Sequence, residues 1–285
     1  MRKLKNNTTI NKNLEYVNCN LCNSDNTKLL FIKDGFNIVQ CRKCGLVYVN
    51  PRLNKETLKN IYTQGYYTTQ DERGYEDYIG RETELKTMFR KRLKRIEKYK
   101  KGGRLLDIGC AVGFFLEVAK ENGWEAFGVE ISEWASNYAR ERGLNVLTGD
   151  LTATKFPDDY FDVITMWAVI ANLHDPHNNL IEACRILKKD GLIVIHTGNI
   201  NSIFAKFQGI NWNMLTPSGH LYYFSPKTLR KMLELIGFKI VKRSTHGDIT
   251  QNERIKNLIG YKYVNWFIVK KLKLGDTMTV YALKT

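Results

Sequence analysis

The sequence predicts an α/β protein with a seven-stranded, mostly parallel sheet, helices on both faces, and a small metal-binding module before it. Two observations lead to this fold class. Strand-like and helix-like segments alternate from residue 104 almost to the end of the chain, which is typical of a parallel sheet covered on both sides. Four of the six cysteines form two C-x-x-C pairs within the first 45 residues. We therefore expect two domains, residues 1–80 and residues 81–285.

Apolar periodicity and glycine stops define each element in order. Residues 81–101 place Leu85, Phe89 and Leu93 at helical spacing ahead of a glycine pair, which predicts a helix. Further helices are expected where an apolar stripe ends at a glycine, and strands where short β-branched runs lie between them. The expected strands are residues 104–109, 125–130, 145–150, 161–167, 192–198, 238–244 and 277–283, and the further helices are residues 114–123, 133–143, 177–191 and 225–237.

Charge is unevenly distributed along the 285-residue chain, whose formal net charge is +15. Residues 105–225 carry 8 basic and 14 acidic side chains, whereas residues 226–285 carry 13 basic and 4 acidic ones. A nucleic-acid enzyme concentrates positive charge around its reaction site, so the acidic middle opposes that class unless the basic flanks fold over it. No apolar run follows the basic start, and no segment reaches the ~18 apolar residues of a membrane span. We expect a cytoplasmic protein.

The two C-x-x-C pairs predict a metal site. Cys19 and Cys22 are followed, after 18 residues, by Cys41 and Cys44. This spacing supplies four thiolates for a tetrahedral Zn²⁺ site in a zinc-ribbon-like module, with a short hairpin between the pairs. Gly45 stands where a left-handed turn residue fits after the second pair. Because four cysteines leave no open coordination position, we expect a structural zinc ion rather than a catalytic one, and zinc rather than an iron–sulfur cluster.

The stretch "LLDIGCAVGFF" predicts a ligand-binding turn between the first strand of the sheet and its helix. Its pattern is D-x-G-x-x-x-G, formed by Asp107, Gly109 and Gly113, and not the G-x-G-x-x-G of a nicotinamide site. The next two strands end in Glu130 and Asp150. An acid after the second strand can accept both ribose hydroxyls of an adenosine. Three acids at successive strand ends suit a neutral or cationic nucleoside; the alternative is that Glu130 and Asp150 only cap helices.

The chain resembles class I S-adenosylmethionine-dependent methyltransferases, and more narrowly the bacterial branch with an N-terminal four-cysteine zinc module, which includes sugar methyltransferases. The matching stretches are "CNLC", "CRKCGLVYVNPR", "IYTQGYY", "LLDIGCAVGFFL", "GVEIS", "GDL", "FDVITMWAVIANLHDP", "RILKKDGLIVIHTGN" and "HLYYFSPKTLRKMLELIGF". The resemblance implies a Rossmann-like sheet and S-adenosylmethionine as cofactor. The contacts that it implies are Asp107, Gly109, Gly113, Glu130, Asp150, Leu151, Met166 and Trp167.

The same resemblance bears on the catalytic residues. The family often has a glycine where Ala111 stands, and commonly a histidine where this chain has Asn172. A hydroxyl acceptor needs a base, and an imidazole titrates in the useful range. We prefer His220 as this base, because "GHLYYFS" is similar to the stretch that lines the acceptor pocket in the family. Tyr222 is its expected orienter, and His174 is the second candidate.

The N-terminal module is interpreted as a lid. We expect the zinc ion to stiffen a small domain that closes over the cofactor cleft, with Tyr66 as a cofactor contact and Tyr67 near the site; the alternative is that both tyrosines end an ordinary packed helix. Closure would exclude water from methyl transfer. The lysines and aspartates between the cysteine pairs give a weak surface for binding phosphate.

These observations predict methyl transfer to a small-molecule acceptor, most simply a sugar or an intermediate of glycan or natural-product biosynthesis. One alternative is a zinc-finger-bearing methyltransferase of ribosomal or transfer RNA. Another is a non-catalytic protein that binds S-adenosylmethionine or scaffolds through its zinc. The segment 257–273 mixes aromatic, apolar and basic residues, so it can lie on a membrane surface; the preferred interpretation is an amphipathic cover between the last two strands. The sequence does not indicate an oligomeric state.

Overall fold

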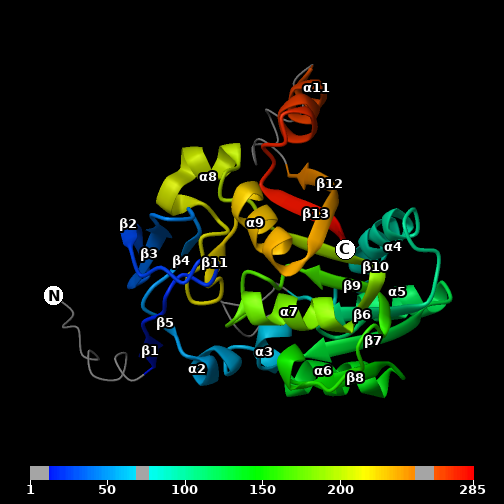
Figure 1. Cartoon of the computed structure of the whole chain (residues 1–285). Coiled ribbons are helices and arrows are strands. Elements are labelled where there is room, and N and C mark those ends of the chain that lie inside the picture. Colours follow the sequence, from blue (N-terminus) through cyan, green and yellow to red (C-terminus); the bar gives the residue numbers. More distant parts are fainter. Residues whose placement is uncertain (1–12, 69–76, 248–259) are drawn as a thin grey trace.

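The computed structural model describes residues 13–68, 77–247 and 260–285. Residues 1–12 and 69–76 of the predicted N-terminal module, and residues 257–259 of the predicted surface segment, lie outside the described part. The central feature is a seven-stranded sheet with the order β12-β13-β10-β9-β6-β7-β8 (Figure 1). In that order the strands are Phe238–His246, Thr277–Lys284, Leu187–Gly198, Phe161–Trp167, Arg104–Ile108, Glu125–Glu130 and Asn145–Thr148.

Strand directions confirm the predicted fold class. Strands β10, β9, β6, β7 and β8 pair in parallel, and β13 runs antiparallel to both β10 and β12. Alternate strand residues enter the two layers of the core. Leu105 and Val163 face one layer, while Leu106 and Ile164 face the other. This alternation is what a sheet covered on both faces requires.

Helices cover both faces of this sheet. One core layer receives α4, α5 and α6, and the other receives α7 and α9. Their bounds are Glu82–Ile96, Phe114–Glu121, Glu133–Glu141, Pro176–Ile186 and Pro226–Ile236.

Two of these helices end well before the expected residue, and the other three end within about one or two residues of it. α7 stops at Ile186 instead of residue 191, because Leu187 already pairs with Phe161 and Asp190 turns the chain with φ +58°. α4 ends at Ile96, before the glycine pair, because the lysine-rich residues that follow offer no apolar stripe to continue it.

The N-terminal module is joined to the main domain by a shared sheet. Its hairpin consists of β2 (Thr27–Lys33) and β3 (Phe36–Cys41), which confirms the hairpin predicted between the cysteine pairs. β4 (Val47–Val49) follows and is completed by β11 (Tyr222–Tyr223) from the far half of the chain. β1 (Leu14–Glu15) pairs with β5 (Arg52–Leu53) beside it.

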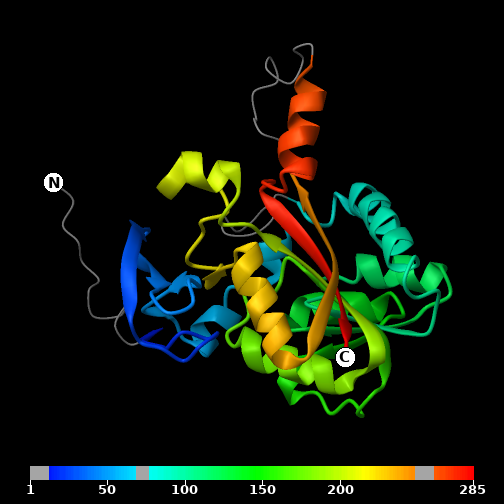
Figure 2. The same ribbon diagram turned by 45° about the horizontal axis from the view of Figure 1, so that its top comes forward.

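Short helical elements fill the remaining connections. They are α2 (Lys55–Lys59), α3 (Gln64–Tyr67), η1 (Leu151–Ala153), α8 (Ile203–Gln208), η2 (Gly209–Asn211), α11 (Tyr261–Trp266) and η3 (Phe267–Lys271). Figures 1 and 2 both show α11 projecting away from the sheet. For α11 the prediction of an amphipathic cover between the last two strands is therefore wrong, whereas η3 does pack against β12 through the buried Val269. In the part of the chain that the structure describes, no helix combines the length and the apolar character needed to span a membrane.

Candidate functional site

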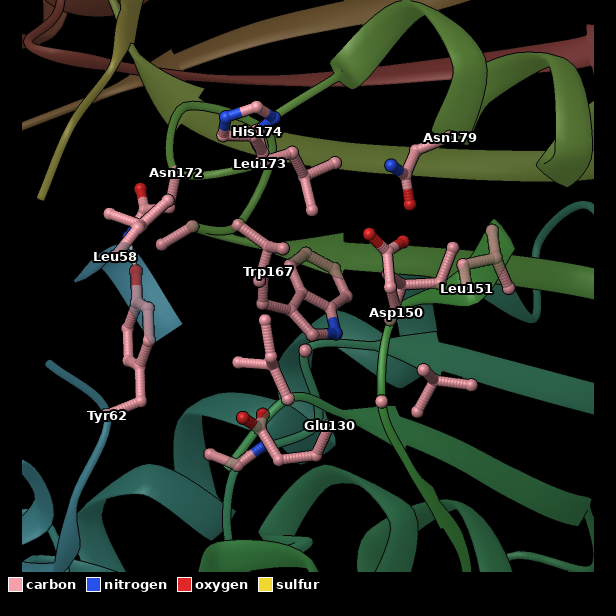
Figure 3. Close-up of a pocket in the computed structure, with 18 of the residues that line it drawn as sticks. Leu58, Tyr62, Glu130, Asp150, Leu151, Trp167, Asn172, Leu173, His174 and Asn179 are labelled. Carbon is pink, nitrogen blue, oxygen red and sulfur yellow. Dashed lines mark hydrogen bonds between the residues drawn. The ribbon is translucent and has the colours of Figure 1, made fainter. Parts of the chain in front are cut away.

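A pocket of about 130 Å³ lies where the parallel strands β6, β7 and β9 end, with the residues that follow β8 on one side (Figure 3). The carboxyl edge of a parallel sheet is the usual ligand site of this architecture. The main domain contributes one wall and the segment after the cysteine module contributes the other. The residues from that segment are Lys55, Leu58, Tyr62, Tyr66, Tyr67 and Tyr78. The pocket therefore forms only where the two predicted domains meet.

Glu130 ends β7 in this pocket and is only 4% exposed. Its carboxylate accepts hydrogen bonds from Ala111 N at 2.9 Å, Ser132 N at 2.9 Å and the Tyr67 hydroxyl at 3.3 Å. Burial raises the pKa of Glu130, and these donors oppose that effect. Ser132, not Glu130, caps α6 by accepting from Ala135 N. Helix capping therefore does not explain why the Glu130 carboxylate lies buried in this pocket.

Asp150 follows β8 and forms an ion pair with Lys55 Nζ at 3.0 Å. It also caps the short helix η1 by accepting from Thr152 N at 3.3 Å, as the alternative interpretation expected. Leu151 is buried beside it and lines the pocket. The ion pair links Lys55 of the N-terminal segment to the acid that follows β8. The Asp150 carboxylate still faces the pocket.

The turn after β6 contains three residues with positive φ, namely Gly109, Ala111 and Gly113. Gly109 has φ +70° and lines the pocket, where an added Cβ would lie 2.3 Å from Val169 Cγ2. Gly113 has φ +89°, but an added Cβ would meet Leu144 at 2.4 Å in the core. Ala111 has φ +51°, a left-handed conformation that glycine adopts more easily. Alanine is therefore strained here, although its N–H still reaches Glu130.

Three predicted cofactor contacts do not line the pocket. Asp107 lies buried beneath it and accepts a hydrogen bond from Thr165 Oγ1 at 2.6 Å, and burial raises the pKa of Asp107 to about 8. Gly113 serves helix packing, and Met166 is a core residue with 0% exposure. The predicted residues that do line the pocket are Gly109, Glu130, Asp150, Leu151, Trp167 and Tyr66.

Sequence reasoning did not assign the polar residues Lys55, Tyr62, Tyr78 and Asn179 to the pocket, and it named Asn172 only as a departure from the family pattern. Asn172 Nδ2 donates to the Tyr62 hydroxyl at 3.1 Å. Figure 3 shows Asn179 pointing toward Asp150, with Trp167 between the two sides of the pocket. Within the described residues, Asn172 Oδ1, Asn179 Oδ1 and Trp167 Nε1 are buried without a hydrogen-bond partner. Buried polar atoms are normally paired, so these three atoms indicate a ligand that carries both donors and an acceptor.

His174 lines the pocket but is held on two sides. Its Nε2 lies 2.7 Å from Glu15 Oε1, and Arg52 Nη2 lies 3.3–3.4 Å from both ring nitrogens. Burial, and next the positive charge of Arg52, lower the pKa of His174. Arg52 also donates to the His174 carbonyl at 2.8 Å and to the Tyr222 hydroxyl at 2.5 Å. His174 is thus part of a network that joins β1 and β5 to the main domain.

His220 lies in a neighbouring cavity of about 50 Å³ that shares Ala168 with the cofactor pocket. Its Nδ1 lies 2.9 Å from both Met214 O and Thr216 Oγ1. A carbonyl can only accept, so Nδ1 carries the proton and Nε2 is the acceptor. Burial lowers the pKa of His220, which keeps the ring neutral near pH 7.

Tyr222 does not orient this histidine as predicted. Its hydroxyl instead accepts from Arg52 and lies 3.3 Å from the His174 carbonyl. Met214 and Thr216 hold the His220 ring in its place.

The four predicted metal ligands lie together. All four sulfur atoms are within 4.8 Å of one another, and the Cys19–Cys44 and Cys22–Cys41 sulfur pairs are 3.4 and 3.5 Å apart. A tetrahedral zinc site with bonds of about 2.3 Å places its sulfurs roughly 3.8 Å apart, so the cluster fits one ion. Burial raises the pKa of Cys19 and Cys44, so only a bound cation would hold all four as thiolates.

Both knuckles have the expected local geometry. Gly45 has φ +83° and its N–H donates to Cys41 O at 2.9 Å, as predicted. Asn23 repeats this in the first pair, with φ +56° and a 2.8 Å hydrogen bond to Cys19 O. Asparagine is among the few residues other than glycine that tolerate this conformation.

The first knuckle also touches the wall of the cofactor pocket. Asn20 stands between Cys19 and Leu21, and its side chain donates to Asp175 Oδ1 and accepts from His177 N, both at 2.9 Å. Asp175 caps α7, the helix that carries Asn179. Through these bonds the cysteine cluster fixes the loop that contains Asn172 and His174.

Comparisons with known proteins agree with this site. Residues 81–243, more than half of the chain, match the family described as methyltransferase domain. An S-adenosylmethionine-dependent methyltransferase structure from Archaeoglobus fulgidus is 27% identical, with a TM-score of 0.51, and the match covers 73% of this chain and 99% of that one.

Two curated relatives are similar over shorter stretches. An uncharacterized protein of Methanocaldococcus jannaschii is 24% identical over 62% of this chain and 86% of its own length. A ubiquinone biosynthesis O-methyltransferase of Methylococcus capsulatus is 29% identical over 34% of this chain, which spans only 44% of that relative. The chain belongs to the methyltransferase-domain family and is an S-adenosylmethionine-dependent methyltransferase.

Proposed function

We propose that the protein methylates a hydroxyl group of a small molecule, with a saccharide as the first acceptor class. The observation that carries this proposal is the tyrosine-lined pocket between the two predicted domains. Aromatic walls stack on sugar rings as well as on planar ones. The relative named as a ubiquinone biosynthesis O-methyltransferase makes phenols the second class to test.

The pocket residues fit S-adenosylmethionine. The Glu130 carboxylate is placed to accept from ribose hydroxyls. Asn179 Oδ1 and the Asp150 carboxylate are two acceptors that face each other, and an exocyclic amine between them would satisfy both. When bound, the cofactor supplies an electrophilic methyl group on a sulfonium. The tyrosines and Trp167 exclude water around it.

His220 is the proposed base. Its ring is neutral, its Nδ1 is fixed by Met214 O, and Nε2 is the atom that can accept the proton of the acceptor hydroxyl. His174 remains the second candidate, but Glu15 and Arg52 already engage its ring. Asn172 cannot take the proton, since an amide does not titrate; its free Oδ1 suits a hydrogen bond from the acceptor.

We also propose one structural Zn²⁺ at Cys19, Cys22, Cys41 and Cys44. Its role is positional: it holds the knuckle whose Asn20 fixes Asp175, and so sets the acceptor side of the pocket. An RNA substrate is less well supported, because Glu130 and Asp150 line the pocket and its one lysine is paired with Asp150.

The test is methyl transfer from radiolabelled S-adenosylmethionine to matched panels of free saccharides, nucleotide-linked saccharides, phenols and total RNA. Label in a saccharide fraction is the expected result. Label in phenols alone would keep the small-molecule reaction and replace the acceptor class. Label in RNA alone would reject the proposal.

A further inference from the structure

The helix α11 and its continuation η3 present large apolar side chains to solvent. Tyr263, Val264, Trp266 and Phe267 are 68%, 46%, 50% and 40% exposed, and we refer to these four as the apolar tip. Tyr263, Trp266 and Phe267 are spaced i, i+3 and i+4, so they share one helix face. A contiguous apolar patch that projects from the body marks an interaction surface.

The base of this helix is fixed, so the tip is held out from the body. Val269 is 2% exposed, and Lys270 Nζ donates to Thr245 O at 2.6 Å on strand β12. Both Figures 1 and 2 show α11 projecting away from the seven-stranded sheet. The anchor at residues 269–270 fixes the C-terminal end of this helical segment to strand β12.

A basic groove of about 430 Å³ begins where this helical segment ends. Leu272 and Lys273, which line it, directly follow η3. Half of its ten lining residues are basic and none is acidic. The basic residues, which define the basic groove, are Lys206, Lys227, Arg230, Arg243 and Lys273.

These cations are largely unneutralised. Among the described residues, Arg230 has a carboxylate partner, Glu234, whereas no ion pair is formed by the other four. The Arg243 Nε atom is buried without a hydrogen-bond partner in the described part of the chain. A groove of this kind matches an anion with several oxygen acceptors, such as a phosphate group.

We propose that the apolar tip and the basic groove together bind the surface of an anionic phospholipid membrane. The tip inserts its aromatic side chains at the level of the headgroups, and the groove takes the phosphate groups of neighbouring lipids. Aromatic residues are favoured at that depth, and each nearby lysine or arginine adds attraction to anionic lipid. The groove explains where part of the +9 net charge of residues 226–285 collects, which the methyl-transfer site does not use.

Nucleic acid is the competing partner, and the shape opposes it. Single-stranded RNA is bound by aromatic rings that lie in a groove beside the backbone track. Here the rings lie on a convex projection, and the aliphatic Val264 and Leu272 are exposed with them, although they cannot stack on a base. An apolar face that includes aliphatic side chains suits lipid.

The experiment measures binding of the full chain to vesicles of phosphatidylcholine alone and with about one third phosphatidylglycerol. We expect binding to the anionic vesicles that weakens with salt. The double variant Trp266→Ser/Phe267→Ser should bind the anionic vesicles with an affinity that is lower by about tenfold or more. Its matched control is Leu29→Ser/Ile32→Ser, two apolar residues 54% and 59% exposed on β2, which should bind like the wild type. Equal loss in both pairs, or equal binding to both vesicles, overturns the proposal.

A second pair of variants tests the groove. Lys227→Gln/Lys273→Gln removes two groove charges, and Lys28→Gln/Lys33→Gln removes two charges from β2. At about fivefold per charge, the groove variant should bind roughly 25-fold less, and the control should change little. Unchanged S-adenosylmethionine affinity shows that each variant is folded. Tighter binding of a single-stranded RNA oligonucleotide than of anionic vesicles, with the same variants impaired, would replace the membrane by RNA.

Discussion

Replacing Glu130 by glutamine tests the placement of the cofactor without removing side-chain volume. The carboxylate accepts from Ala111 N at Oε2 and from Ser132 N at Oε1, each at 2.9 Å. An amide has only one acceptor oxygen, so its NH₂ group must face one of these two donors. The substitution therefore removes both a charge and an acceptor position at the same point of the pocket.

The expected loss follows from the kind of bond that is removed. A hydrogen bond to a charged group contributes about 1.5–3 kcal/mol, which corresponds to roughly 10- to 150-fold in affinity. Burial raises the pKa of Glu130, so the neutral amide also escapes a desolvation cost. We therefore expect the melting temperature to change little while S-adenosylmethionine binding weakens at least tenfold.

Isothermal titration calorimetry at pH 7 measures this directly and needs no acceptor. The matched control is Glu133→Gln, because Glu133 lies exposed in the first turn of α6, three residues along the chain. It should bind like the wild type. Wild-type affinity in Glu130→Gln would refute the assignment of this carboxylate to the cofactor, since no other group takes its place on β7.

Four further predictions concern the metal, the buried acid, the glycine turn and the base. Cys41→Ser should release zinc, as measured by elemental analysis, and expose the N-terminal module to protease while residues 81–243 stay protected; retained stoichiometric zinc would contradict this. The pKa of Asp107 rises from 3.8 to about 8 on folding, so its stabilising contribution is complete below pH 3.8 and is lost as the pH rises through about 8. The stability of the wild type relative to Asp107→Asn should therefore fall across that window in urea titrations, and a constant difference would count against it. Ala111→Gly should raise the free energy of unfolding by about 0.5–1 kcal/mol, because φ at this residue is +51°; a decrease would show that the strain is absent. His220→Asn should lose at least about 100-fold in turnover on an identified acceptor while cofactor affinity is unchanged, and normal turnover would remove His220 from the mechanism.

Most of the sheet could be predicted because its information is local. Each strand of the parallel part is a short apolar run that ends at a turn, and a helix can carry its own stop, as at Gly237 after α9. The end of α7 could not be predicted this way, because the pairing of Leu187 with Phe161 decides it. Strand β11 was missed for the same reason, since two residues carry no periodicity of their own.

The same distinction between local sequence pattern and tertiary packing separates the site residues that could be predicted from those that could not. Glu130 and Asp150 could be placed because consecutive parallel strands end at one edge of the sheet. Asp107 follows the same rule but lies beneath the pocket, where Thr165 binds it. Tyr62 comes from the N-terminal domain and Asn179 from the face of helix α7, so only the packed structure brings them to the cofactor side.

Because β11 pairs with β4, the sheet of the N-terminal module is completed by a strand that is synthesised much later than the module itself. Tyr48 lies opposite Tyr222 in that ladder, so the N-terminal module leaves the ribosome long before its last strand is made. Until then the edge of β4 lacks the partner that it has in the finished protein, and an open edge can pair with another chain. Zinc binding by the cysteines can occur early, because all four ligands precede residue 45. The bound ion would stabilise the hairpin until β11 has been synthesised. A fragment ending at residue 80 should consequently bind zinc and self-associate through β4, whereas the full-length chain covers that edge with its own residues 222 and 223.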